Sequence, residues 1–104
     1  MIPIEKVKNI IEKHSKLESD LSSTDLDKKK FAEMSKEYSD INEIIDDAKF
    51  YTLFDLEKTD LEKIINDKSS DKEMIDLANK ELSELITKNE KVKKRLINLF
   101  IFCN

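Results

Sequence analysis

The side chains that most often do chemistry are scarce in this chain. It has one histidine, His14, and one cysteine, Cys103, which stand far apart in the sequence. Neither has the histidine or cysteine neighbours from which a zinc site is built. Cys103 also lacks a neighbouring base to activate it as a nucleophile. His14 falls among apolar residues at helical spacing, so we interpret it as a semi-buried packing residue with its polar tip near water.

Carboxylates are abundant, but their spacing is typical of a solvated helix face. Glu37, Asp40, Glu43 and Asp47 recur every three or four residues, which places them on one side of a helix. General acid–base catalysis needs a carboxylate with a shifted pKa in a cleft, and this pattern indicates none. Calcium-binding and phosphate-binding loops require glycine, and the chain has 0 glycines. We therefore predict no catalytic residue, no metal site, no cofactor and no enzymatic activity.

An aromatic cluster and a basic run each allow two interpretations. Phe50, Tyr51 and Phe54 indicate a widened core face against which a later helix packs, and the alternative is an exposed patch for a partner. The basic run suits the C-terminus of a helix, where cations favour the macrodipole. Its alternative is contact with nucleic-acid phosphates. The run consists of Lys91, Lys93, Lys94 and Arg95.

Composition points to one helical domain. The chain has 104 residues, 40% of them charged and 38% hydrophobic, with 0 Gly and 1 Pro, so almost nothing interrupts a helix. Regular apolar spacing and a net charge of only -4 argue against disorder. Arg95 is the single arginine among 19 basic residues, so DNA recognition is not indicated. The predicted fold class is all-α, an elongated antiparallel three-helix domain resembling a coiled coil.

Three helices are predicted, over residues about 3–21, 24–66 and 71–100, which together make one domain of residues 1–100. Thr24 is the expected N-cap of the second helix, and Ser70 with Glu73 forms a capping box for the third. A second capping box after Lys58 leaves a break there as the alternative to a continuous second helix. The seam positions follow a 3-4 spacing, and in the third helix they are Ile75, Ala78, Leu82, Leu85, Asn89, Val92, Leu96 and Leu99.

Short connections predict antiparallel neighbours, so the first and third helices should meet at the middle of the second. There the side chains of Leu96, Leu99 and Phe100 would contact Val7 and Ile10, next to Tyr38 and Ile41. Replacing Leu99 by alanine would then cost about 2–5 kcal/mol. An apolar tail of residues 101–104 follows, and we expect weak self-association through Phe100, Ile101 and Phe102.

Neither a signal peptide nor a membrane span is predicted. Residues 1–21 carry charges throughout, unlike a secretory signal. The apolar run of residues 99–103 is far shorter than the roughly 20 residues that span a bilayer. A lone cysteine cannot form an internal disulfide and is typical of a reducing compartment. We expect a soluble, cytoplasmic protein.

Two segments resemble the N-terminal domain of bacterial peptide chain release factor 1. Residues 35–41 read SKEYSDI, and residues 70–82 read SDKEMIDLANKEL; each is similar to a stretch of that family. The short first, long second and third helices also arrive in the family's order, so the resemblance covers residues 1–100. It implies an all-helical domain that lies toward the stalk base of the large ribosomal subunit, with the ribosome as its partner.

The resemblance also implies activities for which this chain lacks the residues. Members of the family recognise stop codons through a Pro-x-Thr loop and promote peptidyl-tRNA hydrolysis through a Gly-Gly-Gln loop. The chain has no glycine, and its only proline is Pro3. Residues 99–104, LFIFCN, depart from the family pattern, and we expect a truncated or frameshifted reading frame or an isolated domain. The alternative is a free-standing helical interaction module or a homodimer.

Overall fold

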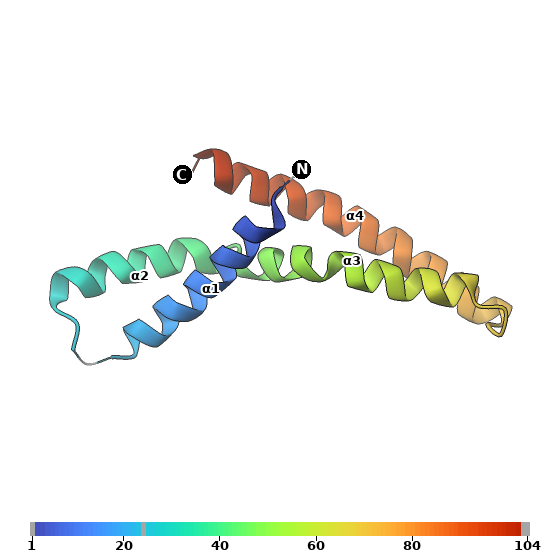
Figure 1. The fold of residues 1–104 in the computed structure, drawn as a ribbon. Coiled ribbons are helices and arrows are strands. Elements are labelled where there is room, and N and C mark those ends of the chain that lie inside the picture. Colours follow the sequence, from blue (N-terminus) through green and yellow to red (C-terminus); the bar gives the residue numbers. More distant parts are fainter. Residues whose placement is uncertain (1, 24, 103–104) are drawn as a thin grey trace.

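The fold is a chain of helices, as predicted. The computed structural model of the protein describes residues 2–23 and 25–102, with side chains up to Leu99, and this part contains no β-strand. Four helices follow one another (Figure 1): α1 over Ile4–Leu21, α2 over Lys28–Asn42, α3 over Ile45–Asn66 and α4 over Lys72–Phe102. The all-α class is confirmed. The helix count differs from the prediction of three because the expected second helix is divided into α2 and α3.

The four helices form an elongated body. Its extents are 61 × 28 × 19 Å, and its radius of gyration is 18.4 Å, against about 13 Å for a compact domain of 100 residues. In Figure 1, α2 and α3 follow each other almost end to end, and α4 runs back along α3. Helix α1 lies along α2 and crosses onto the start of α3. The predicted elongated, antiparallel arrangement is therefore confirmed.

The division between α2 and α3 lies at Glu43 and Ile44, not near Lys58. Here the Ile44 N–H donates to the Ile41 carbonyl at 3.0 Å, a tighter turn than an α-helix makes. Neither residue is a glycine or a proline. The break coincides instead with a long-range contact, because His14 of α1 reaches Asn42, the last residue of α2.

Thr59 explains why no break occurs after Lys58. Its hydroxyl donates to the Asp55 carbonyl at 2.8 Å, inside α3. A threonine that bonds backwards to the carbonyl four residues earlier sits in a helix interior and caps nothing. The second capping box in the sequence therefore lies within one continuous helix.

Two aspartates, rather than the predicted threonine and serine, cap the helices. The Asp27 carboxylate accepts from the Lys30 N–H at 2.7 Å and begins α2. The Asp71 carboxylate accepts from the Met74 N–H at 2.9 Å at the start of α4, so Ser70 is not the N-cap. Thr24 lies outside the described residues. Both helices begin later than predicted because an aspartate in each connection offers the cap.

The core lies where the N-terminal segment (residues 2–7), α3 and α4 meet. Its buried members are Ile2, Val7, Ala48, Val92 and Leu96. The half-buried side chains of Ile11, Ile44, Phe50 and Tyr51 pack around them. Val7 of α1 and Leu96 of α4 thus belong to one cluster, as predicted, and the two ends of the chain share a core.

The position of this junction differs from the prediction. It is centred on Ala48, whereas the ring of Tyr38 stacks on His14. The reason is the connection between α1 and α2, which is longer than predicted because α2 begins at Lys28. Each position of α1 therefore lies opposite a later residue, and Val7 reaches the start of α3. Leu99 is only half-buried, and the side chain of Phe100 lies outside the described part.

Some apolar side chains of the predicted second helix are exposed. Phe31 is 48% exposed, Leu53 50% and Leu56 60%. The described residues of α2 include no fully buried side chain. Leu53 and Leu56 are exposed because α4 covers α3 from one side and α1 crosses α3 only near its start.

The predicted boundary between a domain of residues 1–100 and a tail of residues 101–104 stays a prediction. Helix α4 continues through Phe102, and Cys103 and Asn104 lie outside the described residues. The self-association surface predicted at Phe100, Ile101 and Phe102 also depends on side chains outside the described part.

Candidate functional site

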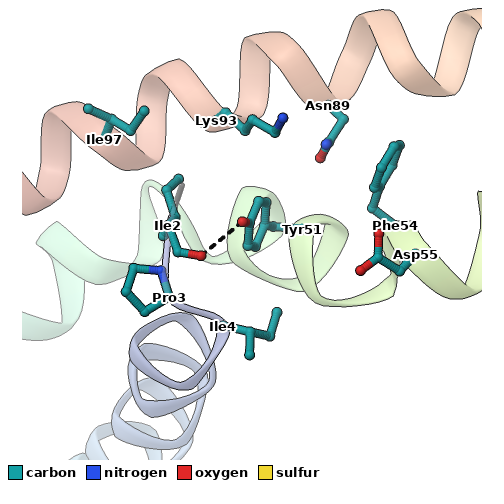
Figure 2. Close-up of a pocket in the computed structure, with 9 residues that line it drawn as sticks. All are labelled: Ile2, Pro3, Ile4, Tyr51, Phe54, Asp55, Asn89, Lys93 and Ile97. Carbon is teal, nitrogen blue, oxygen red and sulfur yellow. Dashed lines mark hydrogen bonds between the residues drawn. The ribbon is translucent and has the colours of Figure 1, made fainter.

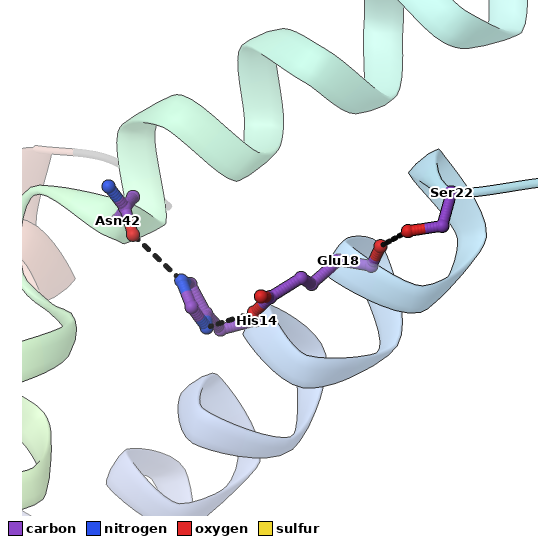
Figure 3. Close-up of polar contacts among 4 residues, drawn as sticks. All are labelled: His14, Glu18, Ser22 and Asn42. Atoms are coloured by element: carbon purple, nitrogen blue, oxygen red, sulfur yellow. Dashed lines mark hydrogen bonds and ion pairs between the residues drawn. The ribbon is translucent and has the colours of Figure 1, made fainter.

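His14 packs at the break between α2 and α3, as its seam position indicates. It is 8% exposed, and its ring stacks on Tyr38 with centroids 4.8 Å apart. Its Nε2 lies 2.9 Å from Asn42 Oδ1 (Figure 3). An amide oxygen only accepts hydrogen bonds, so Nε2 donates. On the other side, Nδ1 lies 3.9 Å from a carboxylate oxygen of Glu18. The Nε2 contact thus holds α1 to α2, whereas the Nδ1 contact lies within α1.

The acidic stripe supplies ion pairs to the fold. Glu37 pairs with Lys13 of α1, and Asp40 lies 3.7 Å from Lys36 on its own helix. Asp47, at the start of α3, accepts two hydrogen bonds from Arg95 of α4. Glu43 is exposed beside the break between α2 and α3. Glu37 and Asp47 thus link neighbouring helices, and Asp47 is half-buried. The interpretation of a solvated stripe holds for Asp40 and Glu43, which are exposed.

Arg95 makes the closest polar contact between α3 and α4. Its Nε and Nη2 donate to the two carboxylate oxygens of Asp47 at 2.5 and 2.8 Å. These hydrogen bonds, together with the charge of Asp47, raise the pKa of the guanidinium. A two-pronged arginine–carboxylate pair defines an orientation as well as a distance. It therefore adds a directional contact to the antiparallel packing of the two helices.

The macrodipole interpretation of the basic run is wrong. Helix α4 continues through Phe102, and its last turn carries no basic residue, whereas the dipole acts within the final turn. Lys93 Nζ lies 3.1 Å from a carboxylate oxygen of Glu90, and Arg95 is held by α3. Lys91 and Lys94 are exposed.

The aromatic cluster is a core face against which α4 packs, as we interpreted it. The ammonium of Lys88, on α4, lies 4.4 Å from the centre of the Phe50 ring. The rings of Phe50 and Phe54 are 6.4 Å apart. The Tyr51 hydroxyl donates to the Ile2 carbonyl at 3.0 Å and ties the N-terminal segment to α3. All three aromatic residues are half-buried.

A groove of about 620 Å³ opens beside this cluster, between the N-terminal segment, α3 and α4 (Figure 2). It is lined by Ile2, Pro3, Ile4, Tyr51, Phe54, Asp55, Asn89, Lys93 and Ile97. Asn89 is only 2% exposed, and its side-chain oxygen has no hydrogen-bond partner. Sequence reasoning missed this groove, although a polar asparagine at a seam position of the third predicted helix was a signal for it.

The described residues offer no grouping of three or more His, Cys, Asp or Glu side chains that could hold a metal ion. Within the same part of the chain, no helix combines the length and the apolar character needed to cross a bilayer.

Comparison with known proteins identifies the family. The PCRF domain matches residues 10–102. Peptide chain release factor 1 of Pelagibacter ubique is 52% identical over 96 residues, which are 92% of this chain and 27% of that protein. Peptide chain release factor 1 of Bacillus subtilis is 35% identical over 100 residues, 94% of this chain and 28% of that protein. The chain thus spans about a quarter of the length of these relatives, and no solved structure matches it significantly. The match over residues 10–102 shows that the chain belongs to the PCRF-domain family of peptide chain release factors.

Proposed function

We propose that this chain is the ribosome-binding domain of a translation termination factor, that it binds at the stalk base of the large subunit, and that it hydrolyses nothing itself. The observation that carries the proposal is the 52% identity to a peptide chain release factor 1 over 92% of the chain. As a domain of this family, it would act in the cytoplasm, where ribosomes translate.

The geometry supports a binding role rather than a catalytic one. Helices α3 and α4 extend beyond α1 as a two-helix arm, and the arm ends in the connection between Asn66 and Lys72 (Figure 1). Leu77, on the arm, is 58% exposed, and an exposed apolar side chain gains free energy when a partner covers it. The chain has 0 glycines, so it cannot form the Gly-Gly-Gln loop that the family resemblance implies for hydrolysis.

The binding part of the proposal is tested by cosedimentation with isolated ribosomal subunits. We expect the chain to sediment with large subunits and to be displaced by full-length peptide chain release factor 1 of Bacillus subtilis. Small subunits serve as the control and should leave the chain in the supernatant. Equal sedimentation with both subunits, or with neither, contradicts the proposal. If the chain forms a dimer in analytical ultracentrifugation and binds neither ribosomal subunit, a free-standing interaction module would be favoured instead.

The catalytic part is tested by a peptide-release assay on ribosomes halted at a stop codon. The chain alone should release no peptide above background, whereas the full-length Bacillus subtilis factor serves as the positive control. In excess, the chain should slow release by that factor because both occupy the same site. Release by the chain alone would contradict the non-catalytic assignment while leaving the binding result intact.

A further inference from the structure

The groove between the N-terminal segment, α3 and α4 contains an unsatisfied polar group. Asn89 is 2% exposed, and its Oδ1 is closed to solvent and accepts no hydrogen bond. Figure 2 shows its carboxamide pointing from α4 toward α3, with Tyr51 on one side and Phe54 on the other. A buried acceptor without a partner is costly and rare in proteins. It gains a bond only if a donor enters from the groove.

The other polar groups of the groove are already engaged or face water. The Tyr51 hydroxyl donates to the Ile2 carbonyl at 3.0 Å. The Lys93 ammonium is held by Glu90 at 3.1 Å, and Asp55 is exposed. The buried side-chain atom left without a partner is therefore an acceptor, Asn89 Oδ1, so a matching ligand brings a donor to it.

The walls of the groove call for an apolar body around that donor. Ile4 and Ile97 at its rim are 39% and 40% exposed, and the rings of Tyr51 and Phe54 face it from α3. Covering such surface is favourable, and aromatic rings pack well against one another at the distances found in protein cores. The volume of about 620 Å³ lies within the range of pockets that hold small organic groups.

We propose that this groove binds a tryptophan side chain of a partner protein, whose indole N–H donates to Asn89 Oδ1. Indole joins a large apolar body to an N–H that donates and accepts nothing, whereas a phenol would bring an oxygen that also accepts. The chain has 0 tryptophans, so none of these 104 residues can supply the ring. In Figure 2 the carboxamide of Asn89 lies between Tyr51 and Phe54, so the indole would approach it beside these two rings.

The probe for this site is N-acetyltryptophanamide, with its 1-methylindole analogue, which lacks the N–H, as the control ligand. Because the protein has no tryptophan, indole fluorescence reports on the probe alone. We expect a blue shift on binding and amide NMR shifts centred on Ile4, Tyr51, Asn89 and Ile97. The methylated analogue should bind about tenfold more weakly, as is typical when a buried acceptor is left unpaired.

Variants of the protein separate the hydrogen bond from the bulk of the methyl group. Asn89→Leu keeps a side chain of similar size without the acceptor, so it should bind both ligands equally well. Asn79→Leu makes the same change at an exposed position of α4 and should keep the tenfold preference. Circular dichroism checks that both variants remain helical.

Several outcomes would overturn the assignment. One is equal binding of the two ligands by the unaltered protein, and another is a preference that survives Asn89→Leu. NMR shifts that lie away from the groove would also refute it. So would a crystal structure in which a trapped water satisfies Asn89 Oδ1 and stays in place at saturating probe. The test is independent of the ribosome, so it can fail while the proposed function stands.

Discussion

Leu96 should carry more of the stability of this domain than any exposed leucine of the same helix. It is 0% exposed and lies in the cluster that joins both ends of the chain. Leu96→Ala removes three carbon atoms, which at roughly 0.8 kcal/mol per buried methylene amounts to roughly 2.4 kcal/mol. The cavity left behind adds to this, and we expect a total loss of about 3 kcal/mol. For a domain of this size that lowers the Tm by roughly 12–24 °C.

Two other leucines of α4 make a matched series. Leu99 is half-buried and Leu77 is 58% exposed. Leu99→Ala should therefore lose about 1–1.5 kcal/mol of unfolding free energy, and Leu77→Ala less than about 1 kcal/mol. All three changes alter helix propensity equally, and differences between them therefore report on packing. The expected loss at Leu99 is smaller than the sequence alone indicated, since that side chain lies at the edge of the core.

The assay is urea unfolding followed by far-UV circular dichroism. A stability change should move the midpoint of the transition and leave its slope with denaturant unchanged. If Leu96→Ala lost no more stability than Leu77→Ala, the junction of α1, α3 and α4 would not form in solution. An equal, large loss in all three variants would instead indicate that the exposed leucine is buried by self-association.

Three further predictions concern polar contacts. Tyr51→Phe removes a hydrogen bond to the N-terminal segment and should cost about 0.5–1.5 kcal/mol in urea unfolding, whereas Tyr38→Phe should cost less. Arg95→Lys cannot reproduce the two-pronged pair with Asp47, so the Tm should fall at low salt, by an amount that shrinks as salt is added. The backbone N–H and the hydroxyl of the serine two residues later lower the pKa of Asp67. The stability that the ionised Asp67 carboxylate gives the fold is therefore present at neutral pH and lost as the pH falls through that lowered pKa. Asp67→Ala should therefore flatten the acid side of a plot of Tm against pH.

Each of these has an outcome that contradicts it. Equal losses in the two tyrosine variants would show that the ring, not the hydroxyl, matters at Tyr51. A Tm deficit of Arg95→Lys that does not change with salt would point to packing of the side chain. An acid limb that is the same in Asp67→Ala and in the unaltered protein would mean that the carboxylate is equally protonated in both states of the chain.

The helices themselves could be predicted because their signals are local. The absence of glycine and the 3-4 spacing of apolar residues act within a few turns of one helix. The seam predicted for the last helix shows this, since Ala78, Asn89, Val92 and Leu96 are buried and the remaining seam positions are half-buried. The segments resembling peptide chain release factor 1 are local as well, and the family they indicated is confirmed.

What the tertiary structure decided are the features that depend on residues far apart in the sequence. The break at Glu43 and Ile44 coincides with a contact between residues 28 positions apart, His14 and Asn42. No glycine or proline marks this break in the sequence. The antiparallel packing of α3 and α4 includes an ion pair across 48 positions. The groove with its unsatisfied Asn89 exists only where three segments converge, because periodicity shows which residues turn inward but not which partner they meet.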